Sequence, residues 1–311
     1  MVTINYNYNK FIFISELAGL RKNPSSKARV SEWLKQGGGQ LSNEEKKYLN
    51  RFKKYFRPFN IYYIESMFMT YDGKTLQQKI SQAVGAEAAD FLFEFLKLID
   101  KRFVLLWKKQ ELILKKLKEK LVSKNNNLIL SEHLAIKLIK PTKSTQPIVY
   151  LLMSSNLKTD FSAWSSTVGK NSTIVIEGGF KEPVANILAV YLHELIHVYL
   201  KTNIGLQNNI KLVAKQLPKK VKSKIKGLSA DKIVEEIMIS ALTPEGYLAK
   251  KCFPKSSIIV KKRPSVSRNY LLSVRRLVAY ELSSLVSDYI KESKNIDLDF
   301  LNKIIQEIKT V

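Results

Sequence analysis

Two of the three histidines in this chain stand four residues apart, in the segment His193-Glu194-Leu195-Ile196-His197. The surrounding residues are apolar at helical spacing, so both imidazoles project from one face of a helix, one turn apart. Two such rings can bind one metal ion at the bond lengths that zinc prefers. Glu194 follows the first of them and can act as the general base toward a zinc-bound water. The segment therefore predicts a metal-dependent hydrolytic centre.

Such a centre needs a third protein ligand, and the chain offers few candidates. The remaining histidine, His133, lies far upstream and is interpreted as a surface or core residue. A histidine six residues past His197 would be another option, but that position is Asn203. The pair Glu235 and Glu236 lies in a mostly apolar predicted helix, so one of the two carboxylates is expected to face inward. We favour Glu236 as the ligand, and Glu235 remains the alternative.

The order of a strand, an HExxH helix, a loop and a Glu-bearing helix resembles the zincin metallopeptidases, and among them the gluzincin group. In that group a downstream motif N-E-x-x-x-D supplies the third ligand. Here Glu235 stands at the Asn position, Glu236 at the ligand position and Ser240 at the position of the Asp, which in that group steadies a histidine. The match is loose, and the 39 residues from His197 to Glu236 are more than the thermolysin-like enzymes have.

The resemblance covers about residues 128–250 and implies a zinc metalloprotease, a hydrolase acting on a peptide or protein substrate. Zn²⁺ would be held by His193, His197 and Glu236, with water as the fourth ligand. Glu194 would activate that water for attack on a peptide carbonyl. Zincins also use a Tyr or His to stabilise the oxyanion, but Tyr199 and Tyr247 are better interpreted as core residues.

The elements that position these residues are predicted to be mainly helical. Ser42 and Glu45 match a capping box, which predicts a helix over about 43–55, and residues 76–123 predict one long helix or a helical hairpin. Short β-type runs at 128–130, 135–139, 148–153 and 172–177 predict a small sheet before the HExxH helix. The expected fold class is therefore α+β. A helical N-terminal region (residues 1–125) would precede a zincin-like domain (residues 126–311).

Around the site itself, the HExxH helix is predicted to begin near Pro183 and to end near Gly205. A basic segment, 206–227, follows and is predicted to be helical with a break at Pro218. Asp231 is expected to cap the helix that bears the two glutamates, and two more helices should occupy about 265–310. In zincins, the strand before the HExxH helix is the sheet edge that binds extended peptide. Residues 173–177 would take that place.

The formal net charge of the 311 residues is +25, and 43 of the 52 basic residues are lysines. This excess can reflect biased composition or an anionic partner, and 206–227 is the place where it would act. One cysteine excludes a disulfide scaffold and a Cys-rich zinc module. No stretch is apolar enough for a membrane span or a signal peptide, so a cytoplasmic location is expected.

Two other functions agree with the same motif. The charge could place the chain on nucleic acid, as in SprT-like proteases that cleave DNA-bound proteins. Those proteins carry HExxH, but they usually bring a cysteine-rich zinc module or further histidine ligands that this chain lacks. Alternatively, the chain could be a catalytically inactive metal-binding or interaction protein that retains the zincin scaffold.

Overall fold

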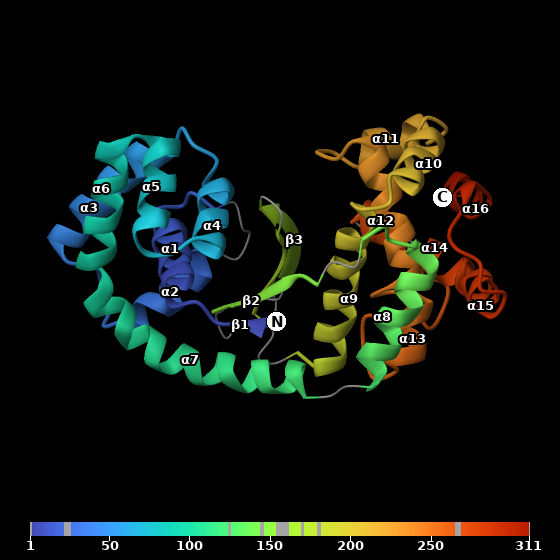
Figure 1. Cartoon of the computed structure of the whole chain (residues 1–311), viewed down its shortest axis with the longest axis horizontal. Coiled ribbons are helices and arrows are strands. Elements are labelled where there is room, and N and C mark those ends of the chain that lie inside the picture. The colour runs from blue at the N-terminus through green and yellow to red at the C-terminus, as the bar shows by residue number, and fades with distance from the viewer. Residues whose placement is uncertain are drawn as a thin grey trace. The chain divides into compact units, whose positions relative to one another are not determined.

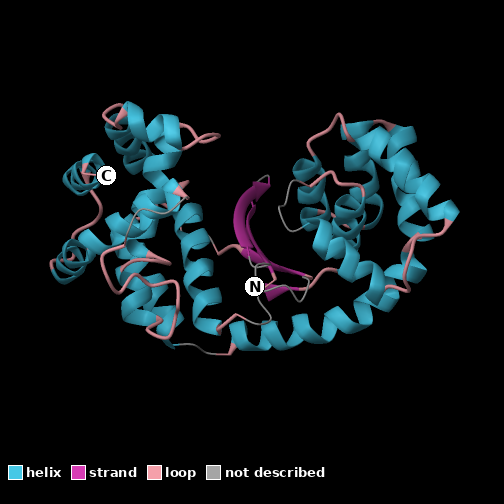
Figure 2. Cartoon of the chain, turned by 180° about the vertical axis from the view of Figure 1, so that it is seen from behind, coloured by secondary structure: helices cyan, strands magenta, loops and turns pink. Residues whose placement is uncertain are grey.

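A computed structural model describes residues 2–21, 26–123, 126–143, 146–153, 162–168, 171–178, 182–264 and 269–310. This part of the chain is mainly helical and contains one four-stranded mixed sheet (Figure 2), so the predicted fold class is confirmed. The chain divides into two compact units (Figure 1). Unit 1 comprises Met1–Val122 and Ile148–Lys181, and unit 2 comprises Ser123–Pro147 and Glu182–Val311. The sheet was expected in one domain with the HExxH helix, but it belongs to unit 1.

Unit 1 combines the N-terminal helices with the sheet. Its helices are α1 (Tyr6–Leu17), α2 (Ser26–Gln36), α3 (Asn43–Phe56), α4 (Ile61–Thr70), α5 (Gly73–Val84), α6 (Ala86–Leu98) and α7 (Asp100–Val122). The capping box of Ser42 and Glu45 begins α3 as predicted. The long helical stretch from residue 76 is broken twice, at Gly85 and at Ile99, and so forms three helices. Gly85 has a φ of 90°, a conformation that glycine adopts without strain and that stops a helix.

The sheet has the order β1 (Val2–Thr3), β2 (Ile148–Leu152), β4 (Asn171–Glu177), β3 (Ser162–Val168). The β1–β2 and β2–β4 pairs are parallel, and β3 runs antiparallel to β4. Residues 173–177 therefore pair on both sides, and their prediction as an edge strand is wrong. The reason is visible in Ile174, Val175 and Ile176, which are all buried, as expected for an interior strand with both faces covered.

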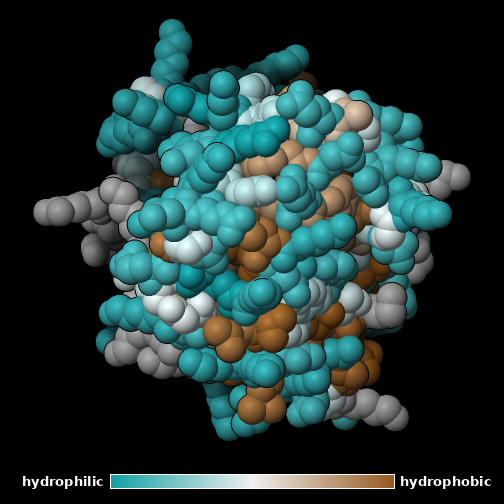
Figure 3. All heavy atoms as spheres, turned by 90° about the vertical axis from the view of Figure 1, so that its left-hand side faces the viewer, coloured by the Kyte–Doolittle hydropathy of each residue, from teal (hydrophilic) through white to brown (hydrophobic). Residues whose placement is uncertain are grey.

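Helix α1 forms the core of unit 1, because its residues from Tyr8 to Glu16 are buried on all sides. Phe11 stacks on Phe68 of α4 with ring centroids 4.4 Å apart and meets Phe52 of α3 edge to face. A helix that is buried on all sides must be covered by other elements, and here neighbouring helices cover it. Figure 3 shows a mostly hydrophilic outer face with smaller apolar patches between the polar side chains.

A buried cluster of charges lies beside this core. Arg21 pairs with Glu16 at 3.0 Å and with Glu65 at 2.9 Å, and Arg29 pairs with Glu177 of β4. Among the described residues, three carboxylates thus share two guanidinium groups. Burial raises the pKa of Glu65 to about 7, although the charge of Arg21 opposes the shift. A proton on Glu65 would leave two carboxylates facing the two guanidinium groups, so burial and charge balance both favour the neutral acid there.

Unit 2 is helical in its described part. Its helices are α8 (Asn126–Ile139), α9 (Val184–Leu200), α10 (Ile204–Ala214), α11 (Lys219–Lys224), α12 (Ala230–Leu242), α13 (Tyr247–Cys252), α14 (Tyr270–Glu281), α15 (Ser283–Lys291) and α16 (Leu298–Lys309). Helix α8 corrects the predicted strands at 128–130 and 135–139. Its buried residues Ser131, Leu134, Ala135, Leu138 and Ile139 follow helical spacing, which short apolar runs hide when each is considered alone.

Smaller corrections concern the helix ends in unit 2. Ser229, rather than Asp231, is the N-cap residue of α12, and Asp231 lies in the first turn. The C-terminal region contains three helices in place of the expected two, because the chain turns at Leu282 between α14 and α15. Within the described residues, no helix is both long and apolar enough to cross a lipid bilayer.

Candidate metal centre

Helix α9 places the HExxH segment in the interior of unit 2. From Asn186 to Leu200 nearly every residue of α9 is buried, and α8, α10 and α12 pack against it. His193, Glu194 and His197 are only 6%, 8% and 9% exposed. Burying three ionisable side chains on an apolar helix costs free energy unless each finds a polar partner. Their partners come largely from α12 and the loop after it.

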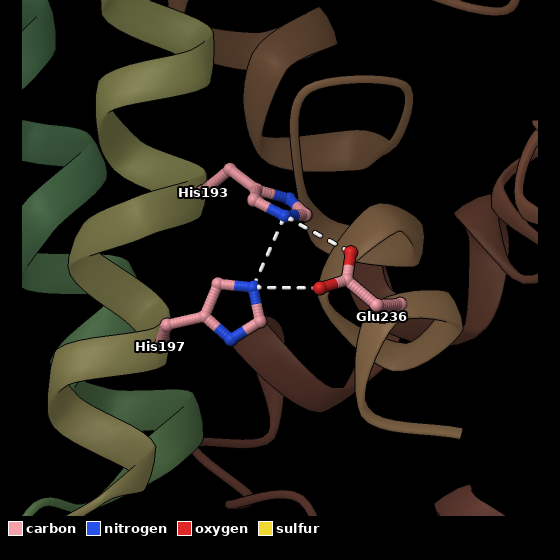
Figure 4. A group of neighbouring side chains, drawn as sticks. All are labelled: His193, His197 and Glu236. Atoms are coloured by element: carbon pink, nitrogen blue, oxygen red, sulfur yellow. Dashed lines mark hydrogen bonds and ion pairs between the residues drawn. The ribbon is translucent and has the colours of Figure 1, made fainter. Parts of the chain in front are cut away.

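Helix α12 brings Glu236 to the two histidines (Figure 4). The Nε2 atoms of His193 and His197 lie 3.2 Å apart. One oxygen of Glu236 lies 3.4 Å from Nε2 of His193, and the other lies 3.2 Å from Nε2 of His197. The three predicted ligands, separated by up to 43 residues in sequence, therefore converge on one point.

The opposite nitrogens of the two rings fix their tautomers. Nδ1 of His193 lies 3.0 Å from the carbonyl oxygen of Thr243, which can only accept a hydrogen bond, so Nδ1 carries the proton. Nδ1 of His197 lies 2.8 Å from Glu235 and donates to that carboxylate in the same way. With Nδ1 as the donor on both rings, each Nε2 faces the other ring and the Glu236 carboxylate. These three groups can share protons or, with Nε2 unprotonated, a metal cation, and hydrogen bonds on the outer nitrogens are typical of metal-binding histidines.

The spacing of the donor atoms fits a tetrahedral ion. Zinc lies about 2.0–2.2 Å from histidine nitrogen and carboxylate oxygen, so two ligand atoms of a tetrahedron are about 3.3–3.5 Å apart. The distances between the three side chains, 3.2, 3.2 and 3.4 Å, are close to this value. Two nitrogens and one oxygen also form a donor set that suits zinc. The residues present therefore fit the predicted ion.

Glu235 has a different place from Glu236. Its carboxylate accepts from His197 and, at 2.6 Å, from Lys232 one turn earlier on the same helix. Burial favours the neutral acid, but these two donors outweigh it and lower the pKa of Glu235. Glu235 thus orients His197, the role that the motif would have given to position 240. Successive residues of a helix point about 100° apart, which is why Glu235 and Glu236 reach opposite nitrogens of that ring.

His197 and Glu236 stabilise each other's charged forms. Burial alone would raise the pKa of Glu236, but the hydrogen bonds with His193 and His197 hold it far below its usual range. Burial likewise disfavours a charged His197, yet Glu235 and Glu236 raise its pKa to about 9. This part of unit 2 therefore has a strong preference for a positive charge between the three side chains.

Arg275 of α14 lies behind Glu236 and is a residue that the sequence did not reveal. Its guanidinium contacts Glu236 at 3.7 Å and Glu245 at 3.2 Å, and its Nε donates to Ser240. Ser240 thus contacts Arg275 rather than a histidine. The loop that carries Glu245 runs very close to α12, since a Cβ on Gly246 would lie 1.9 Å from the carbonyl oxygen of residue 241. Nothing in the local sequence around Arg275 marks this role.

The same loop is anchored to α9 through Thr243. The Thr243 hydroxyl donates to the carbonyl oxygen of Ala189 at 2.8 Å, while its own carbonyl accepts from His193. Two contacts to one helix hold the loop, and through it the ring of His193. Backbone carbonyls carry no sequence signal, so this partner was also missed.

The Glu194 carboxylate has different surroundings from those of Glu235 and Glu236. In the part of the chain that the structure describes, no group donates a hydrogen bond to its carboxylate, although the residue is 8% exposed. Its negative charge contributes to the raised pKa of His197, which shows that the carboxylate lies near the centre. Solvent reaches the site through Glu236, whose side chain is 24% exposed. Glu194 thus lies beside the three predicted ligands, where its charge acts on both His197 and Lys201.

The remaining candidates are not among the three side chains whose ligand atoms meet. His133 is exposed on α8, as one of the two interpretations held. Tyr199 is buried in α9 with 6% exposure, and the Tyr247 hydroxyl bonds to Ser287 at 3.0 Å. Asn203 caps α10 by accepting from the backbone of Leu206.

Comparison of the chain with profiles of known protein families, with curated proteins and with solved structures finds no match.

Proposed function

We propose that this chain is a zinc-dependent peptidase. The observation that carries the proposal is the convergence of His193, His197 and Glu236, with both outer ring nitrogens committed as donors and Glu194 beside them. A zinc ion held there would act as a Lewis acid and lower the pKa of a water toward neutrality. The zincin resemblance of the HExxH segment supports hydrolysis as the reaction class.

In this proposal Glu194 transfers protons, and Glu235 and Thr243 hold the two histidine rings. Glu194 takes a proton from the attacking water and then gives it to the leaving amine. Amide hydrolysis needs this second transfer, because an amine leaves poorly without a proton. Glu235 and the Thr243 carbonyl keep the two rings in the tautomer that presents Nε2. The peptide substrate is inferred from this acid–base chemistry together with the motif, and not from the sheet, since residues 173–177 form an interior strand.

The test combines metal content with peptide hydrolysis. The full chain is loaded with Zn²⁺ and incubated with an unstructured protein and a peptide mixture, and new termini are detected by mass spectrometry. Glu194→Gln should keep the zinc and lower the rate by about 10²–10⁴-fold, the range for loss of a general acid–base. His193→Ala should lose both zinc and activity.

Glu292→Gln, at the exposed C-cap of α15, is the matched control and should change neither the zinc content nor the rate of hydrolysis. A zinc-loaded wild type that cleaves no peptide would support the inactive metal-binding alternative instead. Full activity in Glu194→Gln would exclude the proposed role of that carboxylate.

A further inference from the structure

A lysine-rich surface of unit 2 lies outside the metal centre. Residues 201–230 contain eight lysines and no Asp or Glu, and they also lack arginine and aromatic residues. They form α10, α11 and the turns around these helices. Because like charges repel, such a run is costly to gather on one surface unless an anion lies against it.

The lysines gather around a hollow. α10, α11 and the first turn of α12 enclose a shallow space of about 440 Å³ lined by Lys211, Ala214, Lys215, Lys222, Ala230 and Asp231. Three positive charges thus face one negative charge. The Asp231 carboxylate accepts hydrogen bonds from Ser229 and from the backbone N–H groups of Asp231 and Lys232 in the first turn of α12, so the three lysines supply the positive charge that remains. The hollow therefore suits a group with negative oxygens.

Apolar side chains flank the lysines. Leu212 is 48% exposed between Lys211 and Lys215 on α10, and Leu228 is 40% exposed two residues before Ala230. Ile204, on the same face of α10 as Lys211, is 70% exposed. Single exposed leucines are ordinary, but aliphatic side chains interleaved with lysines form the surface that a lipid headgroup layer accepts. The aliphatic groups enter the acyl boundary while the ammonium groups reach phosphate oxygens.

We propose that this lysine surface docks unit 2 on an anionic phospholipid bilayer, with Lys211, Lys215 and Lys222 on the headgroup phosphates. Nucleic acid is the less suitable polyanion. Bases stack on aromatic side chains and are read by arginine, and residues 201–230 contain neither. Exposed leucines also gain nothing on a phosphate backbone, whereas they gain burial in lipid.

The first experiment measures sedimentation of the full chain with vesicles. The full chain should bind vesicles of phosphatidylcholine with about 30% phosphatidylserine and should dissociate from them as the salt concentration is raised. It should not bind vesicles of pure phosphatidylcholine. The triple variant K211Q/K215Q/K222Q should bind about 100-fold more weakly, given about 1 kcal/mol for each lysine near an anionic surface. The control K108Q/K109Q/K116Q removes the same charge from exposed positions of α7 and should change binding far less.

A second pair of measurements separates lipid from other polyanions. The double variant Leu212→Ser/Leu228→Ser should weaken vesicle binding by about 30-fold, because the exposed parts of two leucine side chains can no longer be buried in the lipid. The same double variant should leave the weak binding to a short DNA duplex unchanged. Equal binding to neutral vesicles, equal loss in the α7 control, or lysine-dependent binding to duplex DNA without vesicle binding would each overturn the proposal.

Discussion

Glu235 and Glu236 differ by one position, yet the structure gives them different relations to the two histidines. Glu236 meets both Nε2 atoms, at 3.4 and 3.2 Å, whereas Glu235 meets only Nδ1 of His197. Replacing each by alanine should therefore weaken metal binding to different extents. This comparison tests the assignment that the sequence left open.

The magnitudes follow from the two roles. Zinc binding in small structural sites amounts to about 10–16 kcal/mol, or about 2.5–4 kcal/mol for each of four ligands. Glu236→Ala should thus weaken zinc binding by about several hundredfold. Glu235→Ala removes the hydrogen-bond partner of the ligand His197, and the loss of such a partner lowers metal affinity by about 10–100-fold. Zinc affinity should therefore fall further in Glu236→Ala than in Glu235→Ala.

The assay is a competition titration of Zn²⁺ between each purified variant and a chromophoric chelator of known affinity. Glu292→Ala, exposed on the surface of unit 2, is the control for a lost carboxylate. Circular dichroism checks that each variant remains folded. If Glu235→Ala loses more affinity than Glu236→Ala, the ligand is Glu235. If both bind zinc as tightly as the wild type, the three-ligand centre is refuted.

Three further predictions concern stability. Arg275→Ala should destabilise unit 2 by about 2–3 kcal/mol in urea, because it leaves the buried Glu245 carboxylate without its cation. The chain should lose about 3 kcal/mol between pH 4.5 and 7.5 through Glu65. Its folded pKa of about 7 exceeds the unfolded value of 4.5, so the contribution is full below pH 4.5 and lost as the pH rises through 7. Ser42→Ala should cost about 1 kcal/mol by removing the cap of α3.

Each of these has its own control. The double variant with Glu245→Gln should recover most of the loss caused by Arg275→Ala, and no recovery would mean that the pair is not the cause. Glu65→Gln should flatten the pH dependence of thermal unfolding, whereas Glu119→Gln, exposed on α7, should leave it unchanged. Equal slopes in wild type and Glu65→Gln would contradict the burial argument. Ser42→Thr should retain the stability that Ser42→Ala loses.

The elements that sequence patterns predicted well are those with local causes. The capping box of α3, the span of α9 and the break at Pro218 all depend on residues within one or two turns. The predictions failed where tertiary context decides. The apolar runs in 128–139 became one helix, because spacing across both runs and packing against α9 determine which side is buried.

The sequence alone placed His193 and His197 on one helix face, since residues at i and i+4 share a face wherever that helix lies, and it placed Glu194 at the adjacent position. For the third predicted metal ligand, the sequence left two adjacent candidates, Glu235 and Glu236. The tertiary structure separated these acids, because the rotation of α12 against α9 turns Glu236 to the inner nitrogens and Glu235 to the outer one. It also supplied Thr243 and Arg275. A carbonyl and a distant guanidinium act through position in space, and no local pattern of residues encodes that position.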